Sequence, residues 1–275
     1  MVKSKYLFLF PNQLTPNSML LTIDIGNTNL TLGLYEGETL KSHWRLATDH
    51  KRMPDEYGLQ LLGVLRQAGC EAGCLTGICL ASVVPHLTRH VEQACKEYLK
   101  IDPLVVDVGI KTGVRILYEN PSAVGADRVA DAVAVHQLYG GPACVIDFGT
   151  ATTFNAVNAK GEYLGGAITA GVNLAASALF EHAAKLPPVD LARPPSVIGK
   201  NTVHAMQSGL LFGYVSMVEG MVSRFRAELG DDMKVVATGG LAKSIAKETE
   251  AIDIIAPWLT LDGLRMIWEM NQPSP

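Results

Sequence analysis

The sequence predicts an α/β protein made of two related halves, each with a mixed sheet flanked by helices. Apolar strand patterns alternate along the chain with amphipathic helical patterns, which is typical of this fold class. The stretch 141–169 repeats the strand, turn, strand opening of 19–48, and Asp24 and Asp147 occupy equivalent places in the two copies. Because the copies lie about one domain length apart, we predict an internal duplication. The expected units are an N-terminal extension (1–18), a first domain (19–139) and a second domain (140–275).

Composition excludes several classes of function. The chain has 275 residues, 48% of them hydrophobic and 18% charged, so it has material for a large core. Its formal net charge is -4 and it has no Lys/Arg-rich run, so we expect no nucleic-acid ligand. The five cysteines include no CxxC pair, so we expect neither a full disulfide framework nor a common zinc spacing, but reduced and mostly buried thiols.

No targeting or membrane segment is expected. The apolar run that begins at Tyr6 is closed by Pro11 and is shorter than the ~7 residues of a secretory signal core. Later apolar runs stay below the ~18 residues of a membrane span. We therefore expect a cytoplasmic protein with no membrane partner.

The first half is predicted to open with an antiparallel meander. Alternating patterns over 19–26, 29–40 and 42–48 indicate strands, and Glu36-Gly37 marks a turn. Pro54 and the acidic pair after it suit the first turn of a helix over 54–68. Further patterns predict a strand at 76–85, helices at 87–99 and 126–138, and a strand at 103–109.

The second half begins in the same way and ends in helices. Strands are expected through Ile146, through Val157 and from Tyr163, followed by helices within 168–186 and 202–229. A strand at 233–240 and a final helix complete the pattern. The helix near 203–229 is apolar over much of its circumference, which fits a subunit interface, the interpretation we favour, or an intramolecular core.

Three strand-end turns have the residues of a phosphate cradle. In DIGNTN (24–29) the strand delivers Asp24 to its carboxyl end, Gly26 lets the backbone approach a ligand, and short polar side chains follow. DFGTATT (147–153) has the same composition, and ATGG (237–240) is a third Gly-rich strand end. A plain hairpin entry is the alternative for DIGNTN alone. No GxxxxGKS or GxGxxG is present, so neither a P-loop nor a Rossmann site is supported.

GADR (125–128) is a candidate catalytic element. Asp127 stands at the start of a predicted helix, from which its carboxylate could project into a cleft. Arg128 suits an anionic substrate. The alternative is that Asp127 caps the helix and Arg128 is a solvated surface charge.

The order DxGNT, GADR, DFGTATT, GKNT and TGG resembles the type III pantothenate kinases, from Met19 to about Trp268. The DFGTATT and GADR pair is the specific part of this resemblance. It implies two duplicated ribonuclease H-like domains of the actin-like ATPase kind. It also implies ATP-dependent phosphorylation of pantothenate to 4'-phosphopantothenate, the first step of coenzyme A biosynthesis.

The resemblance also implies roles for individual residues. Asp127 would be the general base, Asp147 would bind a monovalent cation (K⁺ or NH₄⁺), and Asp24 would hold Mg²⁺. Thr202 would reach pantothenate from the second subunit of a homodimer with shared active sites. The phosphate loop would comprise Asp24, Ile25, Gly26, Asn27, Thr28, Asn29, Leu30 and Thr31, with Thr150 contacting ATP, and the substrate contacts Tyr118, Gly125, Ala126, Asp127, Arg128 and Thr202.

Two rival functions remain open at this point. One is a non-catalytic accessory or regulatory factor of the same fold, and the other is an ATPase switch of the actin kind. The joint presence of Asp24, Asp127, Asp147 and Thr150 argues against a purely binding role, and 275 residues leave little room for the inserted subdomains of a switch. Small departures from the family pattern, at Ala170 and at Met53-Pro54, lie outside the expected catalytic set.

Overall fold

The first of two mixed sheets lies in the N-terminal part of the computed structural model, which describes residues 19–273. Its strand order is β3-β2-β1-β4-β5, with β1 antiparallel to β2 and parallel to β4. The strand β1 is buried along almost all of its length because both faces of the sheet are covered. The strand bounds are β1 (Met19–Ile25), β2 (Asn29–Glu36), β3 (Thr39–Ala47), β4 (Leu75–Ser82) and β5 (Leu104–Val105).

The second sheet repeats this topology. Its order is β10-β9-β6-β7-β8, with β6 antiparallel to β7 and parallel to β9, so β6 takes the place that β1 has in the first sheet. The strands are β6 (Ala143–Phe148), β7 (Ala151–Val157), β8 (Tyr163–Ala170), β9 (Lys234–Gly239) and β10 (Ile254–Ile255). The repeated order and strand directions are the structural form of the duplication predicted from the sequence.

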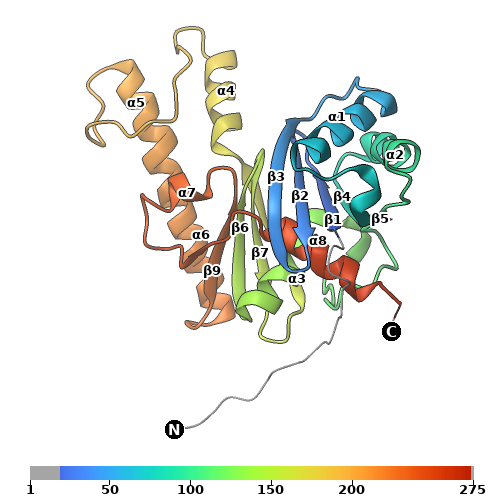
Figure 1. The fold of residues 1–275 in the computed structure, drawn as a ribbon. Coiled ribbons are helices and arrows are strands. Elements are labelled where there is room, and N and C mark those ends of the chain that lie inside the picture. The colour runs from blue at the N-terminus through green and yellow to red at the C-terminus, as the bar shows by residue number, and fades with distance from the viewer. Residues whose placement is uncertain (1–18, 274–275) are drawn as a thin grey trace.

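Helices separate and cover the two sheets in layers (Figure 1). One apolar cluster joins the first sheet to α1 (Pro54–Gln67) and α2 (Pro85–Ala94). A second cluster joins the second sheet to α6 (Tyr214–Leu229) and α7 (Ala242–Ile245). The third lies between the sheets, around α3 (Ala126–Tyr139) and α8 (Leu259–Met270). Two further helices, α4 (Val172–His182) and α5 (Thr202–Ser208), extend from the second sheet.

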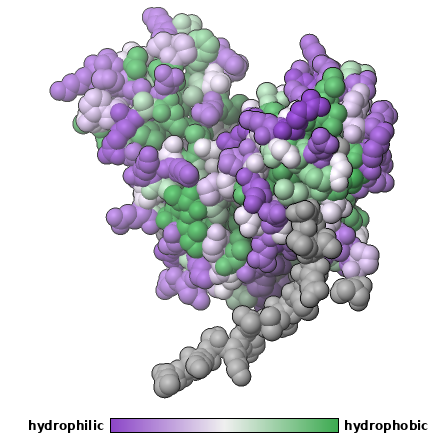
Figure 2. Space-filling view, viewed as in Figure 1, coloured by the Kyte–Doolittle hydropathy of each residue, from purple (hydrophilic) through white to green (hydrophobic). Residues whose placement is uncertain are grey.

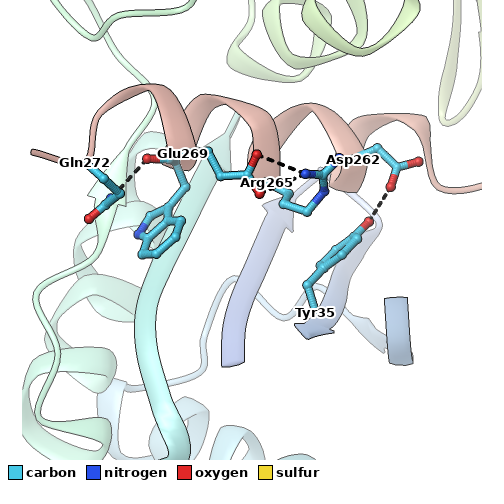
Figure 3. Close-up of polar contacts among 6 residues, drawn as sticks. Tyr35, Asp262, Arg265, Glu269 and Gln272 are labelled. Carbon is cyan, nitrogen blue, oxygen red and sulfur yellow. Dashed lines mark hydrogen bonds and ion pairs between the residues drawn. The ribbon is translucent and has the colours of Figure 1, made fainter. Parts of the chain in front are cut away.

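The helix α8 comes late in the chain but packs on the first sheet. It contacts β1, β2 and β4, and it crosses α3 closely, because a Cβ at Gly263 would lie only 2.0 Å from the backbone oxygen of Ala130. Polar contacts fix it to β2 (Figure 3): the Tyr35 hydroxyl donates to Asp262 at 2.8 Å, and Arg265 lies over the Tyr35 ring. Arg265 also donates to Glu269. Through α8, a segment near the C-terminal end of the sequence therefore becomes part of the first half of the structure.

Most predicted elements are present, with a few instructive differences. The predicted helix over 87–99 ends in a π-helical turn at 95–99, and 209–213 forms a similar turn within the predicted 202–229 helix. The segment 168–170 continues β8 instead of starting a helix. The strand at 103–109 shrinks to β5, and the short β10 was not predicted, since two residues give no periodic signal. The domain boundary near residue 140 stays a prediction.

The cysteines correct one expectation. Cys79, Cys95 and Cys144 are buried free thiols, as expected, but Cys70 and Cys74 form a disulfide. The two pair because the chain turns from the end of α1 through a short 3-10 helix at 72–74, which returns Cys74 to Cys70. Across residues 19–273, no helix has the length and apolar content needed to cross a membrane.

Candidate active site

The two predicted cradles meet at one place in the fold. The turn between β1 and β2 holds Thr28 and the turn between β6 and β7 holds Thr150, and their hydroxyl oxygens lie 2.6 Å apart. Figure 2 shows the surface hollowed between the two lobes. The duplication therefore brings its two polar strand ends to one place.

Backbone contacts from neighbouring segments hold these turns in shape. Thr48, just after β3, donates its hydroxyl to the Gly26 oxygen at 2.7 Å and its N–H to the Thr28 oxygen at 2.9 Å. The Gly171 N–H donates to the Thr150 oxygen at 3.0 Å in the second copy. Asn27, Thr28 and Asn29 stay exposed, so their polar groups remain open to a ligand.

Four carboxylates gather beneath the turns. Asp24 and Asp147 each lie one residue before the end of their strands, β1 and β6, and Asp127 and Asp131 are one turn apart on α3. Burial raises the pKa of Asp24 well above its ordinary value, and the charges of Asp127 and Asp147 raise this pKa further. Burial also raises the pKa of Asp147 to about 7, with Asp127 adding to the effect and the Arg45 guanidinium opposing it. The mutual repulsion favours bound cations at neutral pH.

The carboxylate of Asp127 has a fixed orientation. Gly125 is the N-cap residue of α3, and a Cβ there would lie 2.4 Å from Asp127 Oδ1, so only glycine leaves room for this side chain. The Arg128 N–H donates to the same oxygen at 2.8 Å. Burial raises the pKa of Asp127, an effect that Arg128 partly offsets. Gly125 is therefore the N-cap residue of α3, although the Asp127 carboxylate also binds one of the free N–H groups of the first turn.

Arg128 is held by a chain of polar contacts that the sequence did not predict. Its Nη1 donates to the Tyr163 hydroxyl at 3.3 Å, and that hydroxyl donates to Asn155 Oδ1 at 3.1 Å. The Tyr118 ring lies 6.4 Å from the Tyr163 ring and packs on Gly165. Arg128, next to Asp127 in the sequence, and Tyr118 thus both lie beside Tyr163, and Arg128 is half-buried instead of being a solvated charge.

Thr202 lies apart from these residues, and Asp131 has a partner of its own. Thr202 is exposed at the start of α5, which Figure 1 shows well separated from α3, and no described contact joins Thr202 to the other site residues. Asp131 accepts a hydrogen bond from Thr260 of α8 at 2.8 Å, in keeping with a structural role.

The third Gly-rich turn reaches the same site. Gly239 has a positive φ of 87°, and a Cβ there would lie 2.3 Å from Asp147 Oδ1, so glycine is required beside this carboxylate. The register pairs Asp147 with Thr238 on the neighbouring parallel strand. ATGG therefore closes the site from the second lobe.

A cavity of about 980 Å³ lies nearby without including this chemistry. It is lined by residues of α2, of the segment that follows β5 and of the start of α3, and by none of the four carboxylates. The site is therefore placed by its strand ends and carboxylates and not by the size of a hollow.

Comparison with known proteins shows which family this chain is similar to. A family model described as "Type III pantothenate kinase" matches residues 20–224. Among curated relatives, the type III pantothenate kinase of Moorella thermoacetica is 53% identical over 92% of this chain and 100% of that protein. The one from Roseiflexus sp. is 51% identical with the same coverage. This chain belongs to the type III pantothenate kinase family. The kinase function predicted from its motifs is thereby confirmed, and the two rival functions are not favoured.

Solved structures support the fold of this kinase. A putative Baf family transcriptional activator from Campylobacter jejuni has a TM-score of 0.59 and 18% identity, covering 91% of this chain and 98% of that one. A ROK hexokinase from Thermus thermophilus has a TM-score of 0.51 and 16% identity, covering 92% and 100%. At these identities the likeness concerns the fold alone. It confirms the duplicated, actin-like ATPase architecture predicted from the sequence.

Proposed function

We propose that this kinase transfers the γ-phosphoryl group of ATP to the primary hydroxyl of pantothenate in the cleft between the two strand-end turns, giving 4'-phosphopantothenate. The observation that carries the residue assignment is the position of Asp127. Its carboxylate stands at the start of α3, electrostatically coupled to the strand-end carboxylates and oriented by Gly125 and the Arg128 N–H. We place the reaction in the cytoplasm, where coenzyme A synthesis begins.

Asp127 acts as the general base. A carboxylate whose pKa is raised by burial accepts a proton more readily than an ordinary one, which suits removal of a hydroxyl proton during attack on phosphorus. Its fixed orientation supports in-line attack, since positioning provides much of the catalysis in phosphoryl transfer.

The nucleotide phosphates lie along the first turn. Residues 24–31 supply the exposed polar groups of Asn27, Thr28 and Asn29, and Thr150 contributes its hydroxyl from the second turn. Asp24 would hold Mg²⁺, whose preference for hard oxygen ligands fits this carboxylate. Among the described residues, no group of three or more His, Cys, Asp or Glu side chains is arranged to hold a metal ion by itself. When bound, the ion neutralises phosphate charge.

Pantothenate lies on the Arg128 side of Asp127. Arg128 can bind the substrate carboxylate through its guanidinium, and Tyr163 keeps that guanidinium in place. Tyr118, Gly125 and Ala126 form the adjacent wall. These residues lie together in the fold, which supports a common binding role.

Asp147 binds a monovalent cation, K⁺ or NH₄⁺. Its raised pKa of about 7 reflects burial with little compensation, and a cation beside it would relieve this cost. The Gly239 turn brings backbone close to the carboxylate, and K⁺ accepts carbonyl as well as carboxylate oxygens.

The active unit is a homodimer in which Thr202 completes the partner's site. Exposed large apolar side chains gather on β8, α4 and the segment leading to α5, and Figure 2 shows hydrophobic residues at the surface of this lobe. They are Leu164, Ile168, Leu174, Leu179, Phe180, Val197, Ile198 and Val203. One face of α6 already packs in the intramolecular core, so the interface falls mainly on this neighbouring surface.

The test is ADP release with ATP, Mg²⁺ and pantothenate, in sodium and then in potassium buffer, for wild type and Asp127→Asn. Wild-type release should require pantothenate and rise with potassium. Asp127→Asn should lose about 10²–10⁴-fold in turnover while binding both substrates, because only proton transfer is removed. Asp131→Asn is the matched control, since an amide oxygen can still accept the Thr260 hydrogen bond, and it should stay within about tenfold of wild type.

Four results would contradict the proposal or one part of it. Full turnover in Asp127→Asn would remove the base assignment. Release without pantothenate would indicate an ATPase switch, and no release in either salt would favour the accessory factor. An equal rate in sodium and potassium would remove the cation site alone.

A further inference from the structure

Arg45 lies in line with the phosphate cradle. Strand pairing places Thr31 of β2 opposite Asp24 of β1, and Arg45 of β3 opposite Thr31. Residues opposite each other on paired strands project from the same face of a sheet. Arg45 therefore shares a sheet face with Asp24, two strands away.

The guanidinium of Arg45 also reaches the second half. A Cβ built on Gly240, in the third Gly-rich turn, would lie 3.3 Å from its Nη1. Its Cζ lies 5.7 Å from the ring centroid of Trp258, in the segment between β10 and α8. The positive charge acts on Asp147, whose pKa it lowers. Arg45 thus stands where both halves of the nucleotide site meet.

The N–H donors of the Arg45 guanidinium have no partner among the described residues. Within residues 19–273 it makes no hydrogen bond or ion pair, and its side chain is exposed. An arginine carries five N–H donors in a planar fork that matches phosphate oxygens. Neither 24–31 nor 147–153 contains a lysine or arginine, so the cradles bring no side-chain cation of their own to a polyphosphate.

The duplication provides an internal comparison. In the second sheet the equivalent row is Asp147, Thr153 and Ile168, so the place of Arg45 is taken by an apolar residue that is 61% exposed. The row repeats the carboxylate and the threonine but not the arginine. The shared architecture therefore does not require a cation at this position, which points to a role specific to the first cradle.

We propose that Arg45 binds the terminal phosphates of the nucleoside triphosphate, with Trp258 holding its guanidinium over the Gly240 turn. This rests on the proposed placement of the nucleotide in the cleft. The side chain would neutralise phosphate charge close to the carboxylates, where no ordinary P-loop lysine is available.

The experiment is a binding series with ATP, ADP and AMP for wild type, Arg45→Met and Arg45→Lys, measured calorimetrically with Mg²⁺. Arg45→Met should weaken ATP binding about 10- to 100-fold, as expected for loss of charge-assisted hydrogen bonds, and leave AMP binding within about twofold. Arg45→Lys should fall between, because it keeps the charge but loses the fork. In kinetics, the KM for ATP should rise while the KM for pantothenate stays unchanged.

Lys41→Met is the matched control. Lys41 lies on the same strand as Arg45, is exposed and pairs with Glu36. The Lys41→Met substitution therefore removes one positive charge at a position away from the cleft. It should change ATP affinity by less than about twofold. A loss of AMP binding equal to that of ATP in Arg45→Met would show a structural role and overturn the proposal.

Different results would overturn the placement of ATP and the role of Arg45. If wild type binds no nucleotide, the placement of ATP fails first. If wild type binds ATP more tightly than AMP and Arg45→Met keeps that full difference, only the role of Arg45 is overturned.

Discussion

Asp24, Asp127, Asp131 and Asp147 repel one another in a buried place, and this repulsion has a measurable consequence. Burial raises the pKa of Asp131 well above its ordinary value, as it does for Asp24, and the charges of Asp127 and Asp147 raise both pKa values further. Such groups bind protons more tightly in the folded than in the unfolded state. The site is thus a source of instability that bound cations relieve.

Because of Asp147, the free energy of unfolding should change with pH in a defined direction. Its folded-state pKa is about 7 and its ordinary value is 3.8, so the folded state holds more protons between these values. In buffer without metal ions or potassium, the free energy of unfolding should fall from about pH 4 to pH 7, by on the order of 3 kcal/mol. Asp147→Asn should flatten this slope in chemical denaturation.

Asp102→Asn is the control, because Asp102 is exposed beside Lys96, and its slope should match that of wild type. A wild-type stability that rises over the same pH range would contradict the assignment. Addition of Mg²⁺ and K⁺ should reduce the wild-type slope.

At the scale of elements, the crossing of α3 and α8 positions Asp127. α3 carries Asp127 and Asp131, and α8 supplies the Thr260 hydroxyl that bonds Asp131. The two helices approach closely at Gly263. Contacts of α8 with β2, centred on Tyr35, then fix this pair of helices relative to the first cradle.

Gly263→Ala tests this crossing. Its Cβ would meet the Ala130 backbone oxygen at 2.0 Å, and backbone cannot move aside as a flexible side chain can. We expect a loss of about 3 kcal/mol in the free energy of unfolding by urea, because overpacking strains the core. Gly63→Ala in α1 is the matched helical glycine with open space around it, and it should gain roughly 0.5–1 kcal/mol. Equal effects in the two variants would refute the close crossing.

Much of this architecture could be predicted from the sequence, for physical reasons that differ by residue. Asp24 and Asp147 were accessible because each ends a strongly apolar strand before a glycine, a pattern that is local in sequence. Arg45 was not, since its alignment with Asp24 depends on two successive strand pairings, one of them interrupted by a bulge. Tyr163 and Asn155 were missed because their link to Arg128 arises only when α3 packs against the second sheet.

At the scale of the molecule, the proposed active site takes residues from both lobes and from the proposed partner subunit. Asp127 belongs to the layer between the sheets, whereas Thr202 lies on α5 in the extension of the second lobe. One subunit does not bring the two together. A site built across subunits can be recognised by mixing defective chains.

Mixing Asp127→Asn with Thr202→Ala subunits should restore activity. Each mixed dimer would contain one site with both native residues, so random exchange should give about a quarter of the wild-type activity. Each variant alone should be impaired, Asp127→Asn most severely. The check is the rate after co-refolding, compared with the average of the two separate proteins. A rate no higher than that average would show that Thr202 does not act across the interface.

The late position of α8 in the sequence also affects the order in which the protein can fold during its synthesis. The strands β1, β2 and β4 leave the ribosome early, yet the helix that covers their inner face is translated only after β9. At usual elongation rates, roughly 10 to 35 seconds separate the end of β4 from the start of α8. During that interval α3, which packs on the same face, is made, but the part of the face that α8 covers stays open, so we expect this half of the chain to bind chaperones at the ribosome.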